Sequence, residues 1–248
     1  MSRKHLSANR SYRDAIHPAS GEVGFQVVVE ETDLFVIATE DISQPVAALV
    51  RKLRGELKNH ILFHPEFLSS LDSLPMDAAA PAFIRRMLAA GQVCGVGPMA
   101  AVAGTIAQEV ADHFHTQCPD ILVENGGDVF MHSTRDRTVA LLADPEGGAS
   151  VGLRIKAGQC PLALCASSGR IGHSLSLGTG DLVCVLSRDG SLADAAATAL
   201  CNLLGSKQDL EVVVEQARSL TSSGLLGVFA QYEDQLAAWG DLELVTVD

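Results

Sequence analysis

The chain reads ASSGRIGHSLSLGTGD over residues 166–181 and, after the apolar run 182–186, SLADAAAT over residues 191–198. The apolar run predicts a buried strand, and the Ala-rich segment after it predicts a helix over 192–204. Glycine lets backbone approach a ligand closely, and Ser and Thr supply donors and acceptors without bulk. Asp194 and Thr198 are four residues apart, so their oxygens share one helix face. Two oxygen ligands that face a Gly-rich hydroxyl loop suit a hard cation such as Mg²⁺ that holds a phosphate.

Length and composition limit the class of protein. The 248 residues allow one large domain or two small ones, and we expect a single domain over residues 1–248. Apolar residues make up 47% of the chain but aromatic residues only 4%, so the core must be built from Ala, Val and Leu. A net charge of −12 repels phosphate backbones and argues against a nucleic-acid partner. An anionic substrate would need local compensation, for example by a divalent cation.

The sequence favours a cytoplasmic location. It has no run of eighteen apolar residues, which argues against a membrane partner, and its basic start is not followed by the apolar stretch of a signal peptide. The six cysteines form no C-x-x-C pair, and several lie within apolar runs. We therefore expect small buried hydrophobic side chains in a reducing compartment. The six are Cys94, Cys118, Cys160, Cys165, Cys184 and Cys201.

The order of patterned segments predicts an α+β fold with a mainly antiparallel sheet packed against helices, because no βαβ repeat is present. The clearest pair is a β-hairpin of residues 24–30 and 33–38, followed by a helix from Pro45 to Leu62 that Ser43 caps. Further helices are expected at 65–71, 81–90, 99–113, 192–204 and 208–220, with a Gly/Pro break at 91–98; strands are expected at 12–16, 120–123, 129–132, 138–143, 150–155, 162–165, 182–186, 225–231 and 242–247.

Several short motifs have both a structural and a functional interpretation. The run 124–128 (Glu-Asn-Gly-Gly-Asp) suits a hairpin turn, or glycines that lie against a flat ligand or a phosphate. The run 167–170 (Ser-Ser-Gly-Arg) suits an anion nest or a solvated turn. His173 is either structural or a group that moves a proton. Asp194 could instead be stabilised by the dipole of its own helix, with Thr198 bonded back to the helix backbone.

The remaining histidines carry less information. His60 and His64 are four apart at the end of the first long helix, yet the sequence shows no third ligand for a metal. His113 and His115 are two apart and point in different directions on a helix.

Taken in order, the motifs resemble those of the ApbE family of flavin transferases, and most closely a distant branch of that superfamily. That family has a Gly-Ala-x-x-Lys-Gly helix start, a Gly-Gly-Asp strand end, a Thr/Ser-Ser-Gly turn, a His-x-x-Asp-Pro-x-Thr-Gly loop and an Asp-Ala-x-x-Thr helix. The resemblance covers about residues 97–205 and implies the ApbE-like, T-fold-like arrangement. The corresponding runs here are 99–104, 126–128, 167–169, 173–180 and 194–198.

The resemblance implies a cofactor, a metal and a reaction. Family members bind FAD and Mg²⁺ and transfer FMN to a Thr hydroxyl of an acceptor protein with release of AMP, and some hydrolyse FAD. It implies that Asp194, Thr198 and the carbonyl of Ala100 hold Mg²⁺, and that His173 is the base. The residues that would bind the cofactor are Gly126, Gly127, Asp128, Ser167, Ser168, Gly169, Thr179 and Gly180.

The chain also departs from the family pattern. Ala103 stands where the family has Lys, Ser176 where it has Asp, and Leu177 where it has Pro. Three hypotheses follow: an FMN transferase or FAD pyrophosphate hydrolase, a binding protein that has lost the transfer chemistry, or an enzyme that uses the same cleft for another small substrate. We also expect a homo-oligomer, although the sequence shows no interface.

Overall fold

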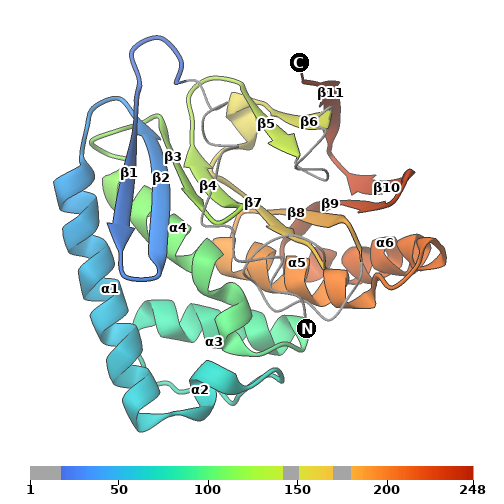
Figure 1. Cartoon of the computed structure of the whole chain (residues 1–248), viewed down its shortest axis with the longest axis horizontal. Helices are drawn as coiled ribbons and strands as arrows, with labels where there is room; N and C mark the ends of the chain where they lie inside the picture. The colour runs from blue at the N-terminus through green and yellow to red at the C-terminus, as the bar shows by residue number, and fades with distance from the viewer. Residues whose placement is uncertain (1–17, 142–150, 170–179, 248) are drawn as a thin grey trace, which may run out of the picture.

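The computed structural model describes residues 18–141, 151–169 and 180–247. Eight strands form one sheet in the order β1-β2-β3-β4-β7-β8-β9-β10, and three more form a second sheet in the order β11-β6-β5 (Figure 1). Every neighbouring pair in both sheets is antiparallel. The expected α+β class with a mainly antiparallel sheet is confirmed.

The elements follow the expected order closely. The strands are β1 (Val23–Val29), β2 (Thr32–Ala38), β3 (Ile121–Asn125), β4 (Asp128–His132), β5 (Arg137–Leu141), β6 (Val151–Ile155), β7 (Leu162–Ser167), β8 (Leu182–Ser187), β9 (Leu225–Tyr232), β10 (Gln235–Gly240) and β11 (Glu243–Thr246). The helices are α1 (Ser43–Phe63), α2 (Glu66–Ser69), α3 (Ala82–Cys94), α4 (Val102–Phe114), α5 (Gly190–Leu203) and α6 (Leu210–Ser219), with short 3₁₀ turns at η2 (Pro98–Ala101), η3 (Ala157–Gln159), η4 (Lys207–Asp209) and η5 (Thr221–Ser223).

The molecule is layered around the eight-stranded sheet. Helices α4 and α5 cover one face of its central strands, and the three-stranded sheet packs on the other face. Strand residues alternate between the two faces, so Phe130 packs with the helices while Met131 packs with Leu153 of the second sheet. The helix-facing core is rich in alanine, for example Ala193 and Ala197 of α5, which lets α5 lie close to the strands.

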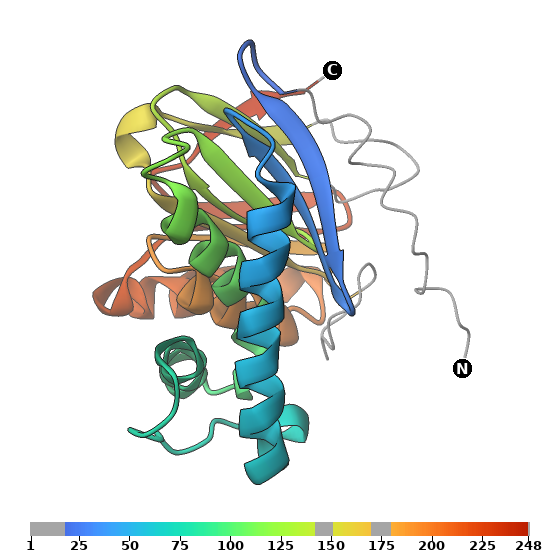
Figure 2. The same ribbon diagram turned by 90° about the vertical axis from the view of Figure 1, so that its left-hand side faces the viewer.

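A second group of helices extends away from the sheet. Figure 2 shows α1 running past the end of the sheet, with α2 and α3 beside its far half. A separate apolar cluster joins these helices, and it includes Leu57 of α1, Phe67 of α2 and Met87 of α3. The small helical layer therefore has its own buried core, which touches the main one through partly buried residues such as Leu49.

Four local expectations are corrected. Ser43 is the first residue of α1 rather than its cap, and its N–H donates to Asp41 Oδ1 at 2.9 Å. Helix α3 continues through Gly91 to Cys94 and is ended by Gly95, which takes a left-handed conformation with φ 69°. Gly91 is needed for packing instead, because a Cβ there would be 2.7 Å from the Val96 carbonyl oxygen. The expected 99–113 helix is a 3₁₀ turn followed by α4. Strand β10 was not expected, because it is a largely exposed edge strand without a clear apolar alternation.

The strand expected at 12–16 lies outside the described residues.

Among the helices that the structure describes, none is by itself long and apolar enough to cross a membrane. Only α3 taken together with the η2–α4 segment passes by length and composition, and the two parts are bent by 107°.

A buried ion pair ties the start of β1 to the second sheet. The Glu22 side chain is 0% exposed; its Oε2 accepts from Arg137 Nη1 at 2.9 Å, and its Oε1 accepts from Nη2. The hydrogen bond from Arg137 is the largest influence on the Glu22 carboxyl and holds its pKa below the ordinary value. Since the folded-state pKa is lowered, this stabilisation is present above the unfolded-state pKa and is lost as the pH falls through the folded-state pKa.

We predict that Glu22→Gln lowers the free energy of unfolding at pH 7 by about 2 kcal/mol, because a charged hydrogen-bonded pair is broken. The loss should shrink at acid pH, where wild-type Glu22 takes up a proton. Urea denaturation at pH 7 and near pH 3 measures both values. Glu215→Gln, which alters an exposed pair with Arg218, is the control and should change neither. A loss of equal size at both pH values would contradict the prediction.

Candidate functional site

The site is built on the crossing of α4 and α5. At this crossing the two backbones touch through Gly104 and Gly190. A Cβ on Gly104 would lie 2.3 Å from the Gly190 carbonyl oxygen, and a Cβ on Gly190 would lie 2.5 Å from the Gly104 carbonyl oxygen. Only glycine fits at either position. The sequence did not indicate this contact, because the two glycines are far apart along the chain.

Buried polar side chains hold the crossing in register. Gly190 N–H donates to Gln108 Oε1 at 2.7 Å, and Thr105 Oγ1 donates to Ser191 Oγ at 2.8 Å. These four residues are all buried, so each hydrogen bond satisfies groups that water cannot reach. The α4–α5 contact is therefore specific in position as well as close.

At this crossing the Asp194 side chain lies at the N-terminal end of α4. Asp194 Oδ2 accepts the N–H of Gly104 at 2.8 Å, and the carboxylate also accepts the N–H of Ala103. These N–H groups belong to the first turn of α4, where helix amides lack internal partners and the dipole is positive. A helix dipole does stabilise Asp194, but it is the dipole of α4; the N-cap of its own helix is Asp189.

Asp128 brings a second carboxyl group to the same region. It opens β4 on the helix-facing side; its Oδ1 accepts the Ala166 N–H at 3.1 Å, and the Cys165 thiol lies next to the carboxylate. Burial, and then the Glu124 carboxylate, raises the pKa of Asp128 to about 7. Burial, and then the Asp128 carboxylate, raises the pKa of Asp194 well above its ordinary value. Two enclosed carboxyl groups that oppose each other's ionisation form a donor set that a cation would stabilise.

The Gly126–Gly127 pair is the hairpin turn between β3 and β4. Asn125 pairs with Asp128, and the two glycines have φ values of 71° and 106°, which favour glycine. The turn lies at the start of α4, since Asn125 Nδ2 donates to the Ala103 carbonyl oxygen at 3.1 Å. The hairpin interpretation is confirmed, and the hydrogen bond of Asn125 places the turn at the N-terminal end of α4.

Ser167 is the most informative residue at the end of β7. It is two residues beyond Cys165 and so faces the helices, and its exposed fraction is 4%. Within the described part of the chain its hydroxyl oxygen has no hydrogen-bond partner. A buried hydroxyl without a partner is uncommon and suits a ligand that completes its hydrogen bonding.

The loop after β7 is described only at its two ends. Gly169 N–H donates to the Gly180 carbonyl oxygen at 3.0 Å, so these ends lie side by side. Gly180 is tight against α5, because a Cβ there would meet the Leu204 side chain at 2.4 Å. Ser168 has partners of its own. Residues 170–179, which include His173, Ser176, Leu177 and Thr179, lie outside the described residues.

The expected metal ligands are brought together only in part. Asp194 and Thr198 lie on one face of α5 and are both buried, at 9% and 7% exposed. Ala100 is in η2, which packs on α5, and its N–H donates to the Gly97 carbonyl oxygen at 3.0 Å. The contacts of Asp194 run to Ala103 and Gly104 rather than to Ala100. The role of the three as metal ligands stays a prediction.

Sequence reasoning missed Asn125, Gly190 and the role of Cys165 at this site. Cys165 was expected only as a buried hydrophobic side chain, and it is indeed buried, as are Cys118, Cys184 and Cys201. Burial, and then the nearby Asp128 and Asp194 carboxylates, raise the pKa of its thiol well above the ordinary value. No sequence signal marks these contacts, because they join segments that meet only in the folded protein.

Solved structures identify the class of fold. The flavinyl transferase ApbE of Pseudomonas stutzeri matches with a TM-score of 0.56 at 13% identity, over 91% of this chain and 94% of that one. The ApbE protein of Thermotoga maritima matches with a TM-score of 0.56 at 11% identity, over 88% and 96% of the two chains. The layered α+β arrangement is thus the fold of the ApbE proteins.

Sequence comparison then gives the family. The family model described as AbpE bacteria matches residues 14–230. A UPF0280 protein of Archaeoglobus fulgidus is 34% identical over 223 residues, 88% of this chain and 92% of that protein. Another UPF0280 protein, from Methanopyrus kandleri, is 40% identical over 195 residues, 77% and 78% of the two chains. The chain belongs to this family of ApbE-like proteins.

We predict that Gly104→Ala lowers the free energy of unfolding by about 3 kcal/mol, because the new methyl group would overlap Gly190 and Asp194. Gly55→Ala in α1 is the matched control: a Cβ there meets no atom within 4 Å, and the change should stabilise the helix by up to about 1 kcal/mol. Urea denaturation of both variants compares the two effects. If Gly104→Ala were as stable as wild type, the close contact of α4 with α5 would be wrong.

Proposed function

We propose that this protein is a Mg²⁺-dependent enzyme that acts on the pyrophosphate of FAD, as an FMN transferase or as a hydrolase that releases FMN and AMP. The observation that supports it is the buried Asp194 carboxylate beside a second carboxyl group at the N-terminal end of α4. Two solved structures with this fold are named flavin transferases, which agrees with a flavin nucleotide as ligand.

The donor set fits Mg²⁺. A hard cation prefers oxygen ligands, and Asp194 and Thr198 offer a carboxylate and a hydroxyl one helical turn apart on α5. The Ala100 carbonyl would be the third protein ligand. When bound, Mg²⁺ would neutralise charge on the pyrophosphate and favour departure of AMP.

The chain's own groups would hold the phosphates. The Gly126–Gly127 turn offers backbone that a ligand can approach without a side chain in the way. Ser167 Oγ, which has no hydrogen-bond partner among the described residues, would donate to a phosphate oxygen. The remaining proposed contacts are Asp128, Ser168, Gly169, Thr179 and Gly180.

In the proposed reaction a hydroxyl oxygen attacks the phosphorus on the FMN side of the pyrophosphate. The hydroxyl belongs to a Thr of an acceptor protein for transfer, or to water for hydrolysis. A bond forms between this oxygen and phosphorus, the bond to the AMP phosphate breaks, and the hydroxyl proton passes to a base. His173 would be that base, as a neutral imidazole able to accept a proton near pH 7.

A second candidate function is FAD binding without turnover. Ala103 supports it, because no cationic side chain is present at this position and its N–H is already used by Asp194. A site with this composition keeps the metal pair and the glycine turn but has lost one positive charge near the phosphates. Release of AMP from bound FAD distinguishes the two functions.

We predict that wild-type protein releases AMP from FAD only when Mg²⁺ is present, and that Asp194→Asn reduces the rate by about 100-fold or more because a charged ligand is lost. Asp234→Asn, in the exposed β9–β10 turn, is the control and should retain the wild-type rate. Chromatographic separation of FMN and AMP measures the rate. Tight FAD binding by wild type with no AMP release would favour the binding protein; equal rates for Asp194→Asn and wild type would remove Asp194 from the metal site.

A further inference from the structure

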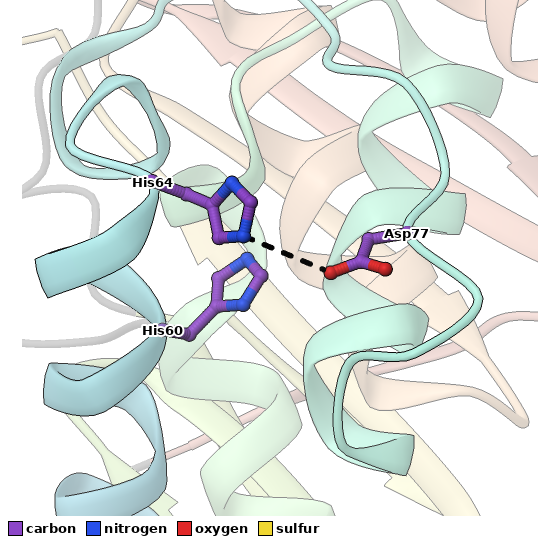
Figure 3. A group of neighbouring side chains, drawn as sticks. All are labelled: His60, His64 and Asp77. Carbon is purple, nitrogen blue, oxygen red and sulfur yellow. Dashed lines mark ion pairs between the residues drawn. The ribbon is translucent and has the colours of Figure 1, made fainter.

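A second cluster of metal-ligating side chains lies at the C-terminal end of α1. His60 lies in the last turn of α1 and His64 caps its C-terminal end, and the chain between α2 and α3 brings Asp77 toward them (Figure 3). Asp77 is the third ligand that the sequence did not reveal, because it lies in an irregular segment and reaches the histidines only after α3 folds back on α1. The cluster is separate from the α4–α5 site and uses none of its residues.

The three side chains are close enough to share one ion. One ring nitrogen of each histidine and one carboxylate oxygen of Asp77 all lie within 4.8 Å of one another. His64 Nε2 is 3.9 Å from Asp77 Oδ2. Ligands about 2 Å from a tetrahedral zinc ion lie roughly 3.3 Å apart. The two imidazole rings are stacked, with centroids 4.5 Å apart, so they would have to turn for both ring nitrogens to face one ion.

The surrounding contacts orient these ligands. Asp77 Oδ1 accepts the Ala79 N–H at 2.9 Å, which leaves Oδ2 directed at His64. Phe67 packs edge-on against the His60 ring, with centroids 4.8 Å apart. Glu66 Oε1 lies 3.7 Å from His64 Nδ1, on the side of the ring away from Asp77. This separation is longer than a hydrogen bond, so Glu66 lies behind the His64 ring without bonding to it.

The space beside the three side chains also suits a metal. The side chains line a hollow of about 300 Å³, together with Glu56 and Asn59. A metal held by three protein groups would therefore keep a coordination position that faces open space.

We propose that His60, His64 and Asp77 bind one Zn²⁺ ion, with the fourth position left to water or to an anionic group of a small ligand. Two imidazoles and one carboxylate favour zinc or a similar transition metal over Mg²⁺, which selects oxygen ligands. The ion would join the end of α1 to the segment before α3. It would stabilise the folded chain, because the three ligands converge only in the folded state.

The test uses the full chain, freed of metal with a chelator and titrated with Zn²⁺ by calorimetry in the presence of excess Mg²⁺. Wild type should bind one Zn²⁺ per chain at this site and gain thermal stability. The double variant His60→Ala/His64→Ala, and Asp77→Asn separately, should weaken binding by at least about 10-fold. His113→Ala, which changes an exposed histidine elsewhere, should bind as wild type does.

Asp77→Asn keeps the result interpretable if the double variant folds poorly, because Asp77 lies outside helices and its side chain is partly exposed. Zinc-edge anomalous diffraction from Zn²⁺-soaked crystals should place a peak between the three side chains. Unchanged Zn²⁺ affinity in Asp77→Asn, or a peak only at cysteine sulfurs, would overturn the proposal. FAD turnover is not a readout here, so the two proposals fail independently.

Discussion

The structure depends on one close contact, the crossing of α4 and α5 at Gly104 and Gly190. Because neither residue has a side chain, the helices approach until backbone touches backbone. That distance lets Asp194, from the first half of α5, reach the free N–H groups of α4. With a larger residue at either position, the carboxylate would not meet the helix terminus. The α4–α5 crossing thus organises the core and the candidate site together.

The electrostatics of the site follow from this packing. Asp194 gains two backbone donors and a positive helix end, but it also shares a buried space with Asp128. The donors lower its pKa, whereas burial and the second carboxyl group raise it, and the raising effects are larger. A bound cation would reverse this balance, because its charge would stabilise both ionised carboxylates at once. The pair of buried carboxyl groups is therefore suited to bind a cation.

The two proposed metal sites differ in their construction. The oxygen groups near α4 and α5 are enclosed by the main core, whereas the histidine cluster stands on the smaller helical layer beside an open hollow. Enclosure and oxygen ligands fit a cation that acts on a phosphate group; imidazoles at an accessible surface fit zinc. In each site two of the proposed ligands are four residues apart in the sequence: Asp194 and Thr198 on one face of α5, and His60 and His64 at the C-terminal end of α1.

Most of the local structure could be predicted from the sequence. Apolar periodicity, the β-rich hairpin and the Gly-Gly turn predicted the element order, the antiparallel class and the pairing of Asp194 with Thr198 on one helix face. It could not predict β10, whose exposed edge position leaves little apolar pattern, or the end of α3, where Gly91 serves packing rather than termination.

Which side chains contact distant segments of the chain could be seen only in the folded structure. In the folded protein Asp194 accepts a hydrogen bond at the N-terminal end of α4, and Asn125 donates one to Ala103. Asp128 lies next to Cys165, and Asp77 lies beside the two histidines. Hydrophobic periodicity is a property of neighbouring residues and is therefore readable along the chain. Contacts between distant segments depend on packing distances and on glycines at crossings, which leave no periodic trace in the sequence.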